Sequence, residues 1–351
     1  ETIPNSKMTE KIKVFGATPS PYTHKMISIL RYRQIPYEAY MGDVVGRLKK
    51  LNIEPPQPVL LPTILLKDEA NNLIPTTDST PIIRRLEKEY SERKLLPDDP
   101  ALSFINYLLE DFGDEWVTKY MFHFRWYFEE DSDNAGTILP LVDLGTDTPD
   151  EALIEFKKFI SNRQIERLWV VGSNDITAGL IDSSFRRFVK LMDNHLAGSK
   201  FLFGEKPSSA DFAFYGQLTQ LIGFDPTSRK IVYHSSKRLI AWVDVMADLS
   251  GHDVNNCKWT VLEDSPETLK ELLKEFGKMY APTLVANAKA KNSGNETWEI
   301  EIDGSIWKQK TFSYQAKCLK WIKDEFNVLN EHDKKRVMKY LDGTGCEKIL
   351  G

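Results

Sequence analysis

The pattern of apolar and polar positions along the chain begins with short segments. Residues 11–15 alternate and end at Gly16, which predicts a strand, and the apolar positions that follow, through Leu30, recur at helical spacing. Five further elements are predicted in this region: strands at 36–41, 63–67 and 73–75, and helices at 44–51 and 79–90. The order β-α-β-α-β-β-α predicts a small α/β domain over residues 11–91.

After Pro100 the pattern changes to long helical periodicities that are rich in aromatic side chains. Four helices are predicted there, at 104–127, 149–168, 181–196 and 208–222. These helices must pack on one another and on one face of the first domain. The sequence therefore predicts that an all-α domain over residues 100–250 follows the α/β domain.

The two ends of the chain differ from both domains. Residues 251–351 are interpreted as a C-terminal extension with a β-hairpin and short helices. Its hairpin is predicted where apolar segments flank Asp303-Gly304, a pair typical of a type I′ turn, and its helices are predicted at 314–326 and 333–340. Residues 1–10 are polar, lack the apolar core of a signal peptide, and are interpreted as a short disordered leader.

Composition narrows the class of protein. The chain has 351 residues, enough for two domains, and a net charge of -5 with both signs interspersed, which argues against a nucleic-acid partner. No apolar run reaches the roughly 18 residues needed to span a bilayer. The cysteines, Cys257, Cys318 and Cys346, lack the C-x-x-C spacing of a zinc or redox site. We therefore expect a cytoplasmic protein with free thiols, no metal, and no membrane or nucleic-acid partner.

The most informative motif lies where the first strand hands over to the first helix. Ser20 is expected to cap this helix, with Pro21 at the first helical position and Tyr22 after it. A helix N-terminus presents unpaired N–H groups and a partial positive charge, so it favours a bound anion such as a thiolate. A cap hydroxyl can add a hydrogen bond to the same sulfur. The alternative is that Ser20 only caps the helix.

Two further motifs occupy junctions of the same domain. The Leu61-Pro62 bond precedes a strand, where a cis proline would turn the main chain of Leu61 outward as an edge for an extended peptide. Asp78 or Ser79 is expected to begin the last helix of the domain, with Pro81 in its first turn. Taken alone, this second motif is also explained as a helix cap.

In their order along the chain, these motifs resemble the N-terminal domain of the glutathione S-transferase superfamily, whose fold is thioredoxin-like. Ser20-Pro21-Tyr22 resembles the active-site turn of the serine-type transferases, Leu61-Pro62 their cis-proline, and Asp78-Ser79 the acidic-Ser pair that takes the γ-glutamyl end of glutathione. The usual pair is Glu-Ser, so Asp78 is a shortened variant. The capping box of Ser208 and Asp211 is similar to that of the family's helical domain. The resemblance covers about residues 11–250.

The resemblance implies that glutathione is a cosubstrate and that Ser20 is the catalytic residue. Because a serine cannot form a mixed disulfide, Ser20 would stabilise the thiolate of glutathione, lowering its pKa by roughly two units. A hydrophobic electrophile would then lie beside the sulfur, between the domains. We expect Tyr22, Trp116, Tyr120 and His123 to line this second-substrate pocket, although packing in a core also explains aromatics at helical spacing.

Three functions follow from this reading. The first is a glutathione transferase that joins glutathione to a small apolar electrophile, with a role in detoxification. The second is a non-catalytic binding or scaffold protein, which the long extension over 251–351 motivates. The third is a glutathione-dependent reductase that uses Cys318 or Cys346. The resemblance also implies a homodimer, whose usual interface the extension could replace or block.

Overall fold

The first domain is built on a four-stranded sheet. The computed structural model describes residues 10–351, so the leader predicted over residues 1–10 lies, apart from Glu10, outside the described residues. The strands are β1 (Ile12–Gly16), β2 (Tyr37–Met41), β3 (Thr63–Lys67) and β4 (Leu73–Thr76), in the order β2-β1-β3-β4. β1 pairs with β2 in parallel and with β3 antiparallel, and β3 pairs antiparallel with β4.

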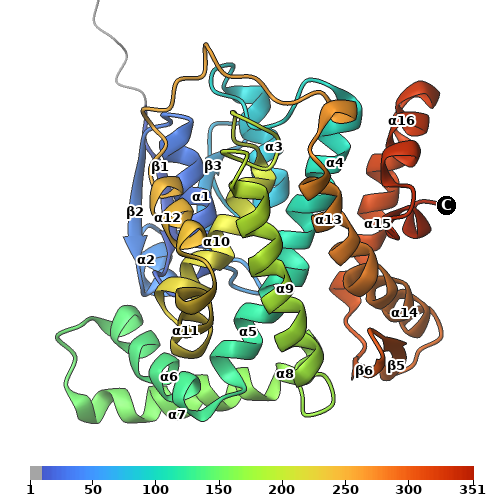
Figure 1. The fold of residues 1–351 in the computed structure, drawn as a ribbon. Coiled ribbons are helices and arrows are strands. Elements are labelled where there is room, and N and C mark those ends of the chain that lie inside the picture. Colours follow the sequence, from blue (N-terminus) through green and yellow to red (C-terminus); the bar gives the residue numbers. More distant parts are fainter. Residues whose placement is uncertain (1–9) are drawn as a thin grey trace, which may run out of the picture.

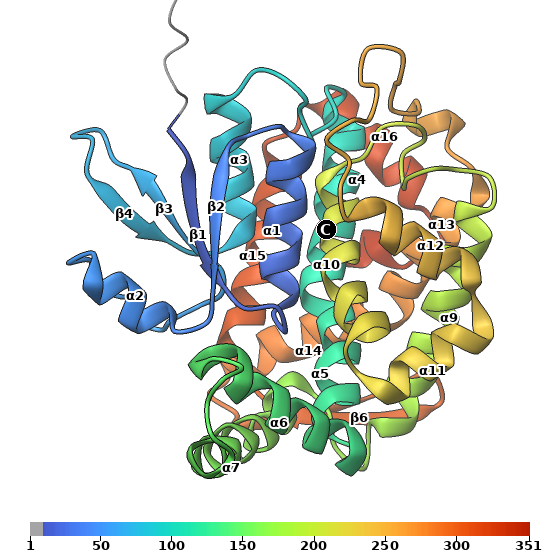
Figure 2. The same ribbon diagram turned by 90° about the vertical axis from the view of Figure 1, so that its left-hand side faces the viewer.

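Helices cover both faces of this sheet. α1 (Pro21–Tyr32) and α3 (Ser79–Glu89) lie on one face, and α2 (Val44–Lys50) lies on the other (Figure 2). Because successive strand residues point to opposite faces, Val14 of β1 joins the main core, whereas Phe15 joins a small separate cluster with Val44 and Leu48 of α2. The predicted thioredoxin-like domain is thus confirmed, with element bounds that differ by one or two residues from those expected.

The second domain is helical. The helix expected at 104–127 consists of three parts: α4 (Pro100–Asp111), a π-helical segment (Phe112–Val117) and α5 (Thr118–Trp126). The other helices are α6 (Glu129–Leu144), α7 (Asp150–Glu166), α8 (Leu168–Val171), α9 (Ala178–Leu196), α10 (Ser209–Gly223), α11 (Pro226–Ser235) and α12 (Lys237–Met246). This confirms the predicted all-α domain, and α7, α9 and α10 lie where helices were expected.

The central helix α10 joins the two domains. It packs closely along α1, and Gly216 makes this approach possible: a Cβ at Gly216 would lie 2.6 Å from the main-chain oxygen of Pro21. Two helices can approach this closely only where one of them lacks a side chain. The first turn of α1, which begins with the Ser20 motif, therefore rests directly on the helical domain.

The extension, residues 251–351, packs into the hydrophobic core that the first two domains share. It consists of a 3₁₀ turn (Leu262–Asp264), α13 (Glu267–Glu275), a π-helical segment (Phe276–Tyr280), α14 (Ala281–Asn292), β5 (Thr297–Ile302), β6 (Ser305–Lys310), α15 (Ser313–Asn327), α16 (Glu331–Leu341) and a 3₁₀ turn (Cys346–Ile349) (Figure 1). Positive φ angles of 50° at Asp303 and 75° at Gly304 confirm the type I′ hairpin. The ring of Trp307 is fully buried and lies 5.3 Å from that of Trp116, and α15 and α16 pack against α4.

None of the helices described over residues 10–351 combines the length and the apolar character that a bilayer crossing requires.

Candidate functional site

The first site element is the N-terminus of α1. Ser20 caps this helix as expected, and its Oγ accepts a hydrogen bond from the main-chain N–H of Thr23 at 3.2 Å. Pro21 occupies the first helical position, where no N–H is required. A hydroxyl that accepts one hydrogen bond keeps its hydrogen for donation. Ser20 is 8% exposed, so a ligand that contacts its hydroxyl would do so where little solvent reaches.

The loop that ends at Ser20 is held from the helical domain by Arg125. The Nη1 of Arg125 donates to the main-chain oxygen of Pro19 at 2.7 Å, while Nε and Nη2 form a two-point ion pair with Asp225 at 2.9 and 3.1 Å. Gln220 completes the support by donating to the main-chain oxygen of Thr18 at 3.1 Å. The Arg125 side chain, buried to 4% exposure, therefore positions the loop and does not face open space.

The second element is the Leu61-Pro62 peptide bond, which is cis as expected. It immediately precedes β3, and the Oγ1 of Thr63 fixes the turn by donating to the main-chain oxygen of Leu60 at 2.8 Å. Within the described chain, the main-chain groups of Leu61 take no hydrogen-bond partner. They are available to an extended peptide laid beside them.

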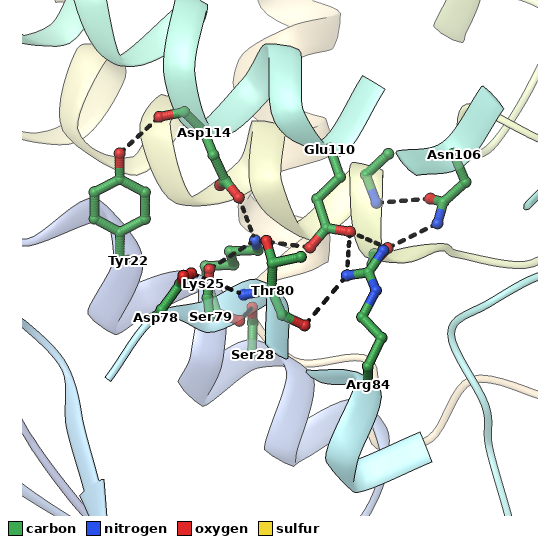
Figure 3. Close-up of polar contacts among 12 residues, drawn as sticks. Tyr22, Lys25, Ser28, Asp78, Ser79, Thr80, Arg84, Asn106, Glu110 and Asp114 are labelled. Atoms are coloured by element: carbon green, nitrogen blue, oxygen red, sulfur yellow. Dashed lines mark hydrogen bonds and ion pairs between the residues drawn. The ribbon is translucent and has the colours of Figure 1, made fainter. Parts of the chain in front are cut away.

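The third element is the start of α3. Asp78 caps this helix with a positive φ of 75°, and accepts from the N–H of Thr80 at 3.4 Å. Burial raises the pKa of the Asp78 carboxyl above its usual value. Ser79, 9% exposed, is the first helical residue, and its Oγ accepts a hydrogen bond from the Nζ of Lys25 at 3.0 Å (Figure 3).

Behind Ser79 lies a buried charge network that joins the two domains (Figure 3). Lys25 of α1 donates to Glu110 Oε1 at 3.0 Å and to Asp114 Oδ2 at 2.7 Å, and Arg84 of α3 donates to Glu110 Oε2 at 2.6 Å. Burial alone would lower the pKa of Lys25, but Asp114 and Glu110 outweigh it and hold the pKa above its usual value. Lys25 is therefore a buried cation.

The two carboxylates of this network differ in their support. Glu110 is bound by Lys25, Arg84 and the hydroxyl of Ser209, and the two cations lower its pKa to about 2 although burial opposes this. Among the described residues, Lys25 is the one side-chain partner of Asp114, and burial raises the pKa of Asp114 to about 6. Its Oδ1 is buried and takes no hydrogen bond from any residue of 10–351. Glu110 is thus the fixed anchor of the network and Asp114 the less satisfied partner.

Tyr22 packs against the π-helical segment. Its hydroxyl donates to the main-chain oxygen of Asp114 at 2.7 Å, and the side-chain amide of Gln315, from α15, reaches the neighbouring oxygen of Glu115 at 3.4 Å. A π-helical turn shifts the regular pattern of main-chain hydrogen bonds, which leaves carbonyl oxygens for other donors. This segment therefore connects the first domain, the helical domain and the extension.

Three residues expected in the second-substrate pocket lie in the interior instead. Trp116, Tyr120 and His123 are fully buried. Tyr120 is hydrogen-bonded to the Oγ of Ser184 at 2.6 Å, and His123 Nδ1 to the Oγ of Ser173 at 2.6 Å. Burial lowers the pKa of His123 to about 4, so it is neutral at pH 7. The prediction that these three side chains line an open cleft is corrected: they form core, because Trp307 of the extension covers Trp116, whereas Tyr120 packs on α9 and His123 on the loop after α8.

The predicted capping box of α10 is present. The carboxylate of Asp211 accepts from the main-chain N–H of Ser208 at 2.9 Å and also from that of Leu202 at 2.8 Å. Asp211 is completely buried, and burial raises its pKa to about 7 despite these donors. Its role is to fix the start of α10 and the loop before it.

Two hollows of the surface lie away from these elements. One, of about 450 Å³, is lined by residues that include Phe128, Thr227 and His234. Another, of about 300 Å³, lies between α9 and α13 and includes Arg187 and Glu271. Neither hollow touches the α1 N-terminus or the start of α3.

Over residues 10–351, no group of three or more His, Cys, Asp or Glu side chains is arranged to hold a metal ion.

Sequence reasoning missed Lys25 and the positioning role of Arg125. Lys25 stands on the apolar face of α1, next to Met26, in a helix whose other inward residues are mostly apolar. A lysine on such a face is almost never buried unless it is paired, and this was the available signal. Its partners could not be found in the same way, because Glu110 and Asp114 lie 85 and 89 residues further along the chain.

Comparison with known families agrees with this architecture. The family model described as "Glutathione S-transferase, N-terminal domain" matches residues 14–94, and the one described as "Glutathione S-transferase, C-terminal domain" matches residues 165–244. The two matched segments follow one another in the order N-terminal domain, then C-terminal domain. No relative among the curated proteins matches the chain significantly.

Several solved structures resemble the chain at low sequence identity. A glutathione transferase family member from Pseudomonas fluorescens, determined with two glutathione bound, is 17% identical, with 69% of this chain and 89% of that chain covered and a TM-score of 0.40. The Tau class glutathione S-transferase of mango, Mangifera indica, is 19% identical, with coverage of 75% and 96% and a TM-score of 0.39. FzlA from C. crescentus is 15% identical, with coverage of 67% and 86% and a TM-score of 0.41.

Proposed function

We propose that the chain is a glutathione transferase in which Ser20 stabilises the glutathione thiolate for attack on a small hydrophobic electrophile. The observation that carries this proposal is the free hydroxyl hydrogen of Ser20 at the N-terminus of α1. A thiolate placed there would receive a hydrogen bond from Ser20 and the favourable field of the helix N-terminus. Both interactions stabilise the anion and not the thiol, so they lower the pKa of the bound sulfur.

The other site elements suit the rest of the tripeptide. The unpartnered main chain of Leu61, beside Pro62, offers a peptide edge to the cysteinyl part of glutathione. Asp78 and Ser79, at the N-terminus of α3, offer a carboxylate and a hydroxyl to the zwitterionic γ-glutamyl end. Pro21 and Tyr22 form the first turn of α1. Of the four residues expected near the electrophile, only Tyr22 is still proposed to line the second-substrate pocket.

A steady-state assay with an activated aryl halide tests this proposal. The wild type is expected to turn over and to be retained on immobilised glutathione. Ser20→Ala is expected to lose about 10²–10³-fold in kcat, the usual effect of deleting one donor to a developing or bound anion, while Ser20→Thr, which keeps the hydroxyl, loses less. Equal activity of Ser20→Ala and the wild type would refute the catalytic role.

A second candidate is a binding or scaffold protein without turnover. It is favoured by the burial of Trp116, Tyr120 and His123, which removes the expected wall of the electrophile pocket. Retention on immobilised glutathione together with no turnover of any aryl halide or epoxide tested would select it.

The reductase alternative loses support. Cys318 and Cys346 are both buried, and burial raises the pKa of Cys346 to about 12, which leaves no thiolate at pH 7.

The homodimer implied by the resemblance would have to use surfaces other than the side of α4 that α15 and α16 cover. Light scattering of the intact chain measures which oligomer forms.

A further inference from the structure

The buried ammonium of Lys25 determines which way the hydroxyl of Ser79 can donate. An ammonium has three hydrogens and no lone pair, so it can only donate. The three hydrogens of Lys25 have acceptors at 3.0 Å on Ser79, 3.0 Å on Glu110 and 2.7 Å on Asp114 (Figure 3). Ser79 Oγ must therefore accept from Lys25, and its own hydrogen is left for another acceptor.

The position of Lys25 is fixed from behind. Glu110 holds it at one carboxylate oxygen, while its other oxygen is bound to Arg84 at 2.6 Å and to Ser209 at 2.7 Å. Lys25 is 1% exposed and lies against α10, where a Cβ on Gly216 would come 3.1 Å from the Lys25 Cβ. An ammonium held in this way cannot swing out to bind a ligand itself.

The free hydrogen of Ser79 lies where negative charge is favoured. Ser79 is the first residue of α3, so the positive end of that helix lies beside its hydroxyl, while Glu110 and Asp114 balance the charge of Lys25. Its Oγ has Lys25 as its one hydrogen-bond partner in the described chain. A carboxylate is the acceptor that such a hydroxyl, in such a field, binds best.

We infer that Lys25 is a positioning residue for ligand recognition: it orients Ser79 so that the Ser79 hydroxyl donates to the α-carboxylate of the γ-glutamyl group. This inference rests on the proposed function, because it takes glutathione as the ligand. It assigns Lys25 an indirect role, through Ser79, and adds it to the residues that determine affinity. The same helix α1 then serves both ends of the tripeptide, with Ser20 at the sulfur and Lys25 behind the carboxylate.

Calorimetry with altered ligands tests this assignment. Three ligands are compared: glutathione, an analogue with a γ-aminobutyryl group, which lacks the α-carboxylate, and an analogue with a glutaryl group, which lacks the α-ammonium. The wild type is expected to bind the γ-aminobutyryl analogue ~10–100-fold more weakly than glutathione, the usual effect of one hydrogen bond to a charged group. Lys25→Met is expected to reduce this discrimination to less than about 3-fold, because Ser79 is no longer oriented.

Matched variants separate this role from a structural one. Arg84→Met removes the other cation from Glu110 but does not touch Ser79, so it should keep the carboxylate discrimination of the wild type. Ser79→Ala, a small change, should lose it as Lys25→Met does. Because Lys25→Met leaves Asp114 unpaired, Lys25→Met/Asp114→Asn, which keeps the net charge of the network, is measured beside it. Discrimination against the glutaryl analogue should persist in all of these variants.

The outcomes are distinct. Full carboxylate discrimination in Lys25→Met or in the double variant overturns the role of Lys25, even though glutathione binds. Full discrimination in Ser79→Ala also overturns it. Failure of the wild type to bind glutathione refutes the proposed function itself, and this inference with it.

Discussion

The Arg125–Asp225 pair provides a quantitative prediction for the loop that carries Ser20. Asp225 is 0% exposed, and within the described part of the chain the two-point contact with Arg125 is its one ion pair. Replacing Arg125 with Met would leave this carboxylate buried without its partner. Breaking a buried pair in this way costs about 3–5 kcal/mol of the free energy of unfolding. It would also release the main-chain oxygen of Pro19.

The predicted loss depends on pH. Burial already raises the pKa of Asp225 to about 6, against the pull of Arg125, and removing Arg125 raises this pKa further. A carboxyl with a raised pKa takes up a proton more readily in the folded state than in the unfolded state. The free-energy cost of burying its charge is therefore absent at low pH and grows as pH rises through the folded pKa. We therefore expect a small loss of stability in Arg125→Met at pH 5 and a loss about 2–3 kcal/mol larger at pH 8, since each pH unit above the wild-type pKa adds at most about 1.4 kcal/mol.

Urea unfolding followed by tryptophan fluorescence measures both values, from the midpoint and slope of each transition. The control is Arg125→Met/Asp225→Asn, which removes the stranded charge and should recover most of the loss at pH 8. An equal loss at pH 5 and pH 8, or a double variant no more stable than the single one, would show that the pair is not the buried contact described here.

Three further predictions concern stability and the thiols. Asp211→Ala should lower the free energy of unfolding by about 2–4 kcal/mol in urea, since two buried main-chain N–H groups lose their acceptor. Gly216→Ala should lower the melting temperature, at a cost of about 1–3 kcal/mol, because its Cβ would meet main-chain oxygen at 2.6 Å, whereas Gly223→Ala, with open space around it, should not. Under native conditions, mass spectrometry should find Cys257 alkylated well before Cys346, whose pKa burial raises to about 12.

The sequence predicted best those features that depend on a few neighbouring residues. The cap at Ser20, the cap at Asp78 and the turn at Asp303-Gly304 each arise from local chemistry, and each lies where expected. The helix α6 was missed because its first turn is acidic and polar and Pro140 stands inside it, so its periodicity is weak. Tertiary packing overrides such a weak local pattern.

The features that sequence reasoning could not supply depend on contacts between distant segments. The spacing of Trp116 and Tyr120 correctly indicated a helix, but it could not show that Trp307 of the extension covers Trp116 or that α9 covers Tyr120. A cleft was therefore expected where the protein has core. The network behind Ser79 was likewise hidden, because Lys25 and Asp114 belong to different domains.

The proposed function requires a glutathione sulfur that is held as an anion at the start of α1, and the pKa of the bound thiol measures this directly. The thiolate absorbs in the ultraviolet, so a pH titration of the glutathione complex gives that pKa. We predict a value about two units below that of free glutathione for the wild type, and a rise of about one to two units in Ser20→Ala, as expected for the loss of one charge-assisted hydrogen bond. A bound thiol that titrates as it does in free solution, or whose pKa is unchanged in Ser20→Ala, would contradict the proposed role of Ser20.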